Sequence, residues 1–89
     1  MKLLVVGMER KQGNFIAKDT NQQVDYDNTI IYGVGVREGV KGQFVAELKV
    51  KTERAVSLGV DVGDVIVADV DRKYGKVLDL DIVKKGDSN

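Results

Sequence analysis

The valines of this chain, sixteen among 89 residues, fall mostly in short alternating stretches that end at glycine or polar residues. Alternation with a period of two is typical of a strand that buries one face, and valine favours the extended backbone. Residues 43–53 are the clearest case. The inward positions there are Phe44, Ala46, Leu48 and Val50, and the outward positions are Gln43, Glu47, Lys49 and Lys51. The pattern predicts an all-β domain.

Strand patterns cover residues 2–9, 15–19, 22–36, 43–53, 64–72 and 76–84, with a polar break at 10–14. The connection at 54–63 has room for at most one or two helical turns before Gly59. Gly33 and Gly35 lie within one strand pattern and indicate a close approach or a bend. We expect about five strands and no strong helix. A single domain should span residues 1–85, with residues 86–89 as a disordered tail.

Turn lengths predict the register of two hairpins. A loop with an even number of residues centred on Thr20 and Asn21 would set Ala17 opposite Val24. The same loop sets Phe15 opposite Tyr26 and so creates a cross-strand aromatic pair. In the last hairpin, a three-residue loop at 73–75 keeps the apolar sides of both strands together. It pairs Val70 with Leu78, Ala68 with Leu80 and Ile66 with Ile82.

The chain contains no histidine and no cysteine, which excludes disulfides, thiolate zinc sites and Ser-His-Asp or Cys-His catalysis. Its longest apolar run, residues 3–6, is too short for a membrane span or a signal sequence. We therefore expect a cytoplasmic protein that is not an enzyme, has no membrane association and holds no metal or cofactor. The net charge is zero, whereas nucleic-acid-binding domains are usually basic.

Five aspartates in the second half of the chain are a candidate cation site. They are Asp64, Asp69, Asp71, Asp79 and Asp81. Carboxylates two residues apart share one face of a strand, and clustered carboxylates suit magnesium or calcium. We favour the alternative, a solvated outer face of the last hairpin, because strand spacing supplies no pocket that would desolvate a carboxylate.

Four of the five aromatic residues lie beside basic residues at or near predicted loops. The first hairpin carries Arg10, Lys11, Phe15, Lys18 and Tyr26, Tyr32 lies further along it, and the last turn carries Arg72, Lys73, Tyr74 and Lys76. Bases of single-stranded nucleic acid stack on exposed rings while Lys and Arg contact the phosphates. The alternative is ordinary cross-strand packing for three of these rings, with Tyr74 capping a neighbouring patch.

The chain resembles the single-stranded DNA-binding (helix-destabilising) proteins of filamentous phages, the gene V protein type, and their relatives on other mobile elements. Residues 10–15, Arg-Lys-Gln-Gly-Asn-Phe, are similar to the stretch that opens the family's DNA-binding hairpin. Residues 63–67 and 73–78 are similar to its closing pair of strands with an aromatic-Gly turn. The resemblance covers most of the chain, and the order and spacing of these segments carry it. Ile16 stands about where the family often has an aromatic residue.

The resemblance implies a small five-stranded OB-like antiparallel barrel with a projecting hairpin, assembled as a homodimer. It implies a sequence-tolerant protein that coats and protects single-stranded DNA during replication of a phage or mobile element, with single-stranded RNA as a further ligand. By position, Arg10, Lys11 and Lys18 would contact phosphate. The stacking candidates would be Phe15, Tyr26, Tyr32 and Tyr74, and the last turn would add Arg72, Lys73 and Lys76.

Two features of the residues themselves favour a homodimer. The first strand is apolar on both faces, and Val65, Val67 and Val83 lie opposite the inward side of the last hairpin. A barrel of this size covers one face of each strand, so the second apolar face should meet another subunit. The alternative function is a non-catalytic β-barrel subunit for protein interaction or assembly, with Phe15 and Tyr74 buried in a partner.

Overall fold

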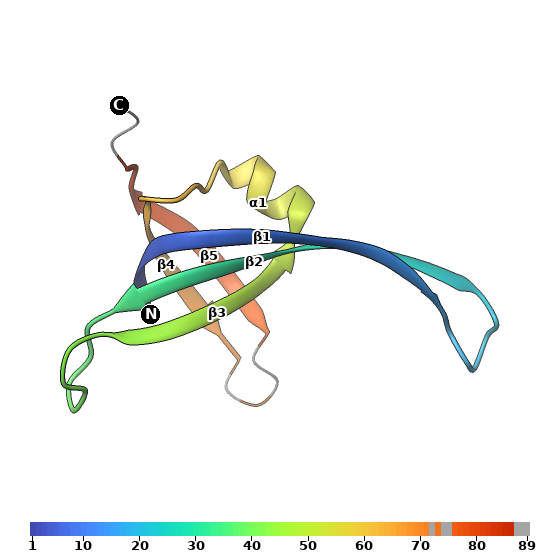
Figure 1. Ribbon diagram of the computed structural model, residues 1–89, viewed down its shortest axis with the longest axis horizontal. Coiled ribbons are helices and arrows are strands. Elements are labelled where there is room, and N and C mark those ends of the chain that lie inside the picture. The colour runs from blue at the N-terminus through green and yellow to red at the C-terminus, as the bar shows by residue number, and fades with distance from the viewer. Residues whose placement is uncertain (72, 74–75, 87–89) are drawn as a thin grey trace.

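A computed structural model of the chain describes residues 1–71, 73 and 76–86. Its elements are β1 (Lys2–Ile16), β2 (Gln23–Gly35), β3 (Phe44–Lys51), α1 (Thr52–Leu58), β4 (Val65–Val70) and β5 (Val77–Lys84). The five strands form one antiparallel sheet in the order β3-β2-β1-β4-β5 (Figure 1). The prediction of a mostly β fold with five antiparallel strands is confirmed.

The core lies on one side of β1, β2 and β3, where the β4–β5 pair crosses behind them (Figure 1). Its buried residues are Leu3, Val5, Ile31, Leu48, Val50, Ala55, Val60, Ile66, Ala68, Val77 and Leu80. Helix α1 packs against β2 and β3 and ends where Gly59 takes a left-handed backbone with φ of 77°. The expected short helical connection before Gly59 is therefore present. In the described residues no backbone pairing joins the edge strands β3 and β5, so the sheet is open there.

β1 and β2 continue away from the core as a hairpin that we call the arm, residues 10–29 (Figure 1). Asn28 and Thr29 at its base also pair with β3, and the arm is two-stranded from the Gln12–Asp27 pair to its tip. Most of its side chains are exposed on both faces. The sequence predicted a break at residues 10–14, and this was wrong. Continuous pairing from Arg10–Thr29 to Ile16–Gln23 satisfies the backbone there, so the strand forms without apolar alternation.

The register of the arm differs from the prediction by two residues. Phe15 pairs with Val24, not with Tyr26, and Tyr26 pairs with Gly13. The reason is the loop at 17–22, where Asn21 has a φ of 56° and its amide donates to the Ala17 carbonyl at 2.8 Å. This loop closes the hairpin at Ile16–Gln23. The observed register differs from the predicted one by an even number of residues, so Phe15 and Tyr26 still lie on the same face of the arm, as diagonal neighbours.

In the last hairpin two of the three predicted pairs are confirmed, Ala68 with Leu80 and Ile66 with Ile82. The third was wrong, because an irregularity after Asp69 pairs Val70 with Val77. Leu78 is left 56% exposed as a result. The centre of the predicted turn, residues 74 and 75, lies outside the described residues.

A β-bulge in β1 decides which side chains of the arm face away from the core. Leu3 and Val5 point into the core, and the register shifts between Val5 and Gly7. After the shift the core-side positions are the even ones, beginning with Met8. Lys11, Gly13 and Phe15 therefore lie on the opposite side.

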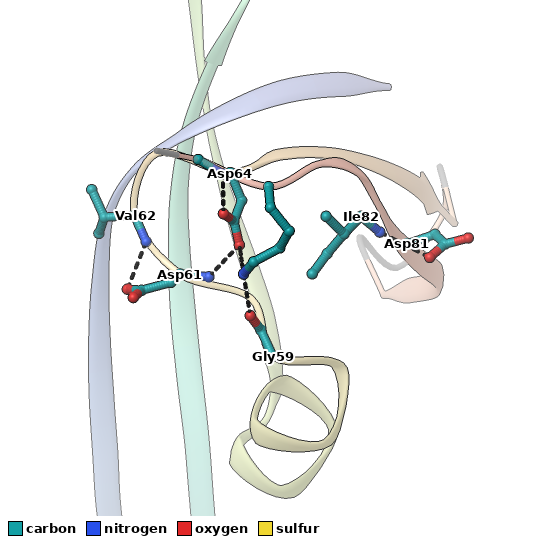
Figure 2. A network of polar contacts seen from close by, with 8 residues as sticks. Gly59, Asp61, Val62, Asp64, Asp81 and Ile82 are labelled. Carbon is teal, nitrogen blue, oxygen red and sulfur yellow. Dashed lines mark hydrogen bonds and ion pairs between the residues drawn. The ribbon is translucent and has the colours of Figure 1, made fainter. Parts of the chain in front are cut away.

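The buried carboxylate of Asp64 binds Lys85 and Gly86, the last residues that the structure describes. The Asp64 side chain is 2% exposed and accepts the amide protons of Asp61 and Gly86 at 2.8 and 2.7 Å (Figure 2). The Lys85 ammonium donates to Asp64 at 2.6 Å and to the Gly59 carbonyl at 2.7 Å. These bonds hold the Asp64 pKa below its usual value, the Gly86 amide being the largest cause and Lys85 the next. Gly86, predicted to begin the tail, is thus tied down, and residues 87–89 lie outside the described residues.

Candidate nucleic-acid interface

The surface of β1, β2 and β3 that faces away from the core, called the front face below, gathers side chains from three separate segments. Directly paired residues of antiparallel strands share a face. From Gly7 onward along β1, after the bulge, the paired rows on this face are Phe15–Val24, Gly13–Tyr26, Lys11–Asn28–Lys51, Glu9–Ile30–Lys49 and Gly7–Tyr32–Glu47. Lys11 and Lys51, which are far apart in the sequence, therefore flank Asn28.

Two aromatic rings lie together on the front face of the arm. The ring centroids of Phe15 and Tyr26 are 6.4 Å apart, with 39° between the ring planes. Phe15 is 53% exposed and Tyr26 is 41% exposed. The rings support each other without being covered, so both keep surface on which a planar ligand can stack.

Three neighbouring depressions share lining residues, and we call them together the basic groove. The first, about 380 Å³, is lined by Lys11, Phe15, Tyr26, Asn28, Ile30 and Lys49. The second, about 260 Å³, shares Asn28 and Lys49 with the first. The third, about 410 Å³, shares Lys51 and Arg54 with the second and lies beside α1. The basic groove thus extends from the aromatic pair, past the middle of β2 and the end of β3, to the start of β5 and to α1.

Positive charge dominates the walls of the basic groove. Its cationic residues are Lys11, Lys49, Lys51, Arg54 and Lys76, and the carboxylate among its described lining residues is Glu53. The Arg54 guanidinium also lies 3.4 Å from the Val77 carbonyl and 3.5 Å from the Leu78 carbonyl, at the open edge of β5. On the same face, the Glu9 carboxylate lies 3.8 Å from the Lys11 ammonium. The described lining of the basic groove still carries more cations than carboxylates, although the chain has no net charge, and this local excess would attract a polyanion.

Four of the residues proposed from the sequence line the basic groove. They are Lys11, Phe15, Tyr26 and Lys76. Tyr32 lies on the front face outside it, where its hydroxyl donates to Glu9 at 2.9 Å. This hydrogen bond raises the pKa of Tyr32. Lys18 is exposed in the loop at the tip of the arm.

The other proposed residues lie elsewhere. Arg10 and Ile16 are on the opposite face of the arm, and Arg10 makes a two-pronged ion pair with Asp27 at 3.0 and 2.6 Å. That pair raises the Arg10 pKa. The Lys73 amide donates to the Asp71 carboxylate at 2.8 Å. Arg72 and Tyr74 lie outside the described residues.

The sequence reasoning missed Lys49, Lys51 and Arg54. Lys49 and Lys51 were correctly expected to face outward, and the missing information was the strand order. Because β3 pairs with β2 from Asn28 to Gly35, both lysines lie beside the base of the arm. The outward alternation at 49 and 51 was the available signal, had β3 been placed next to β2.

The aspartates singled out in the second half do not form a shared site. Asp69 and Asp79 lie opposite each other as expected, whereas Asp64 points into the molecule and binds the chain end. Within residues 1–71, 73 and 76–86, no three acidic side chains gather to hold a metal ion. The same residues include no helix with the length and apolar character that crossing a bilayer requires.

Comparison with known protein families, with curated proteins and with solved structures finds no match for this chain.

Proposed function

We propose that this protein binds single-stranded DNA through the basic groove and the front face of the arm. The observation that carries the proposal is the exposed Phe15–Tyr26 pair at one end of a groove lined by lysines from β1 and β3. Bases would stack on the two rings, and each stacked base is worth about 1–3 kcal/mol. The phosphates would contact Lys11, Lys49 and Lys51.

The proposed binding is tolerant of sequence. Stacking uses the face of a base, which all bases have, and lysine attracts phosphate as a point charge. Single-stranded RNA offers the same two groups and would be a further ligand. We propose that the protein coats and protects single strands in the cytoplasm during replication of a phage or mobile element, as the resemblance to gene V type proteins implies.

We also interpret the five strands as a partly open OB-like barrel. The edge strands β3 and β5 approach each other, and Arg54 reaches from α1 to the β5 edge. OB folds of this partly open kind bind oligonucleotides on one sheet face. Here the arm would extend that face beyond the barrel.

The proposal is tested by titrating fluorescently labelled oligo-dT and a duplex of the same length at two salt concentrations. We expect tighter binding to the single strand, because the bases of a duplex are not free to stack on the arm. Equal or stronger binding to the duplex would contradict the proposal.

The part of the front face on the other side of the β1 bulge from the arm supports the proposal that the protein acts as a homodimer. Val45, Val34, Leu4 and Val65 form one directly paired row across four strands. A depression of about 300 Å³ lies over this row and is lined in part by Leu4, Val34, Val36 and Val65. A two-fold axis along the strands, between β1 and β2, would place the row against itself in a second copy.

The size of this apolar surface fits a second copy. With Val36 and Val67, the row exposes on the order of 400 Å², which is the size of the largest apolar patch on a typical monomer, and such patches are often functional. A standard interface buries about 800 Å² per partner, of which a little over half is apolar. The row would supply that apolar part and leave the basic groove open. A different protein partner on this row would instead favour the assembly-subunit function.

A further inference from the structure

Four polar side chains form a chain of hydrogen bonds at the base of the arm, on the face opposite Lys11. Thr29 and Thr52 are buried, and their hydroxyls are 2.9 Å apart. The Thr52 hydroxyl also lies 2.6 Å from Asp27 Oδ1, to which it donates. Arg10 donates to both oxygens of the same carboxylate, at 3.0 and 2.6 Å. Asp27 is therefore the point where β1, β2 and the first residue of α1 meet.

The network lies between the two halves of the proposed binding surface. One half is the arm, with Lys11, Phe15 and Tyr26. The other half includes Lys51 and Arg54, the residues on either side of Thr52 and Glu53. Asp27 links Arg10 to Thr52 on the face of the arm opposite Lys11, Phe15 and Tyr26. Loss of the Asp27 hydrogen bonds would change the orientation of the arm relative to Lys51 and Arg54.

We propose that Asp27 is a positioning residue that fixes the arm relative to α1, and that Arg10 acts through Asp27 and does not contact phosphate. This inference rests on the proposed single-strand binding. A two-stranded ribbon is only marginally stable in water, so its direction needs support from the domain. Charge-assisted hydrogen bonds to one carboxylate provide that support, and a pre-oriented arm loses less freedom when a strand binds.

The hydrogen bonds of the network lower the pKa of the Asp27 carboxyl group. The pKa of Asp27 is lowered to about 2, chiefly by the hydrogen bond from Arg10 and next by that from Thr52. Asp27 therefore stays ionised, as a charged acceptor for both donors, at a lower pH than an ordinary aspartate does. Arg10 is correspondingly committed to a protein carboxylate on the face away from Lys11.

The first test compares Asp27→Asn with Asp25→Asn in the full-length protein, using labelled oligo-dT. Both changes remove one negative charge from the same face of the arm, and Asp25 lies outside the network, with a 3.4 Å contact to Gln23. Charge alone predicts tighter binding for both variants, since the ligand is a polyanion. A positioning role predicts that Asp27→Asn weakens binding about tenfold, while Asp25→Asn does not. Equal or tighter binding by Asp27→Asn would overturn the proposal.

The second test uses Arg10→Gln, which leaves Asp27 and Thr52 in place, and Lys11→Gln as the matched neighbour. If Arg10 positions the arm, Arg10→Gln weakens binding without changing the slope of log K against log salt. Lys11→Gln should reduce that slope by about 0.7, the value for one lost contact to a single strand. The same reduction in Arg10→Gln would mean that Arg10 contacts phosphate, and the proposal would be wrong.

A third measurement separates this inference from the proposed function. Amide exchange of residues 11–26 without nucleic acid should be about tenfold faster in Asp27→Asn than in Asp25→Asn. If the wild type fails to bind oligo-dT, the proposed function is wrong, and the exchange result alone decides whether Asp27 holds the arm. Equal exchange in the two variants would overturn the positioning role whatever the protein binds.

Discussion

The ring of Tyr26 lies across the backbone of Gly13. A Cβ atom at Gly13 would come within 2.7 Å of Tyr26 Cζ, so a side chain at that position must displace the ring. The ring thus occupies the space that a side chain at residue 13 would fill, and it lies beside Phe15. Glycine at this position is therefore part of the proposed stacking surface.

Gly13→Ala should weaken binding to oligo-dT by about 1 kcal/mol or more while leaving the core intact, because it disturbs one stacking ring. Titration gives the affinity, and thermal unfolding checks the fold. The control is Gly7→Ala, whose Cβ would meet the Tyr32 ring at an ordinary 3.6 Å. Unchanged affinity in Gly13→Ala would show that the orientation of Tyr26 does not matter for binding.

The sequence predicted those parts of the fold that depend on local alternation. The facing of Phe44 to Lys51 was correct, and so was the close approach at Gly33, where a Cβ would lie 2.9 Å from that of Leu3. The register of the arm was wrong because it depends on the left-handed backbone of Asn21, which alternation does not encode. The same limit applies to Val70, whose partner is set by an irregularity in pairing.

The sequence predicted the site residues of the first hairpin but not those of β3, because the latter depend on the order of the strands in the sheet. Lys11, Phe15 and Tyr26 are close along one hairpin, so local spacing finds them. Lys51 joins them only because β3 pairs with β2. Arg10 looks equivalent to Lys11 in the sequence, yet adjacent strand residues point to opposite faces, and Asp27 engages it.

Asp64→Asn should lower the free energy of unfolding at pH 7 by about 2–3 kcal/mol, because a buried carboxylate with charged and backbone donors is replaced by a neutral group. The Lys85 share is small, since that ammonium is 58% exposed. Urea unfolding gives the value. Asp81→Asn, which changes an exposed carboxylate bound to the Ile82 amide (Figure 2), is the control and should have little effect.

The effect of Asp64 should depend on pH in one direction. Its pKa is lower in the folded state than the ordinary 3.8, so its contribution is present above that value and is lost as the pH falls through the folded pKa. The difference between wild type and Asp64→Asn should therefore shrink as the pH falls below 3.8. A difference that grows with acid would contradict the assignment.

The arm should exchange its amide hydrogens fastest among the paired strands of the unbound protein. Its pairing is exposed on both faces, whereas residues 44–50 cover the core. Exchange measured by NMR or mass spectrometry checks this. If the arm exchanged as slowly as residues 44–50, its description as a separate projecting element would be wrong.

Val45→Lys should convert the proposed homodimer into a monomer without unfolding the protein, because Val45 is 73% exposed and lies outside the core. Sedimentation at micromolar concentration reports the change. Val56→Lys is the control, since Val56 is equally exposed on α1, away from the apolar row. A wild-type protein that sediments as a monomer would rule out the second copy, and a stable complex with another protein would favour the assembly function.

The central claim is that stacking and charge act together in one groove, and the salt dependence of oligo-dT binding tests it most directly. The measurement compares wild type with Tyr26→Ala and Lys51→Gln, and Lys41→Gln is the control for a lysine outside the groove. We predict that Tyr26→Ala costs about 1–3 kcal/mol at every salt concentration with an unchanged slope. Lys51→Gln should flatten the slope by about 0.7, and Lys41→Gln should leave it unchanged. Wild-type slopes and affinities in both groove variants would contradict the account.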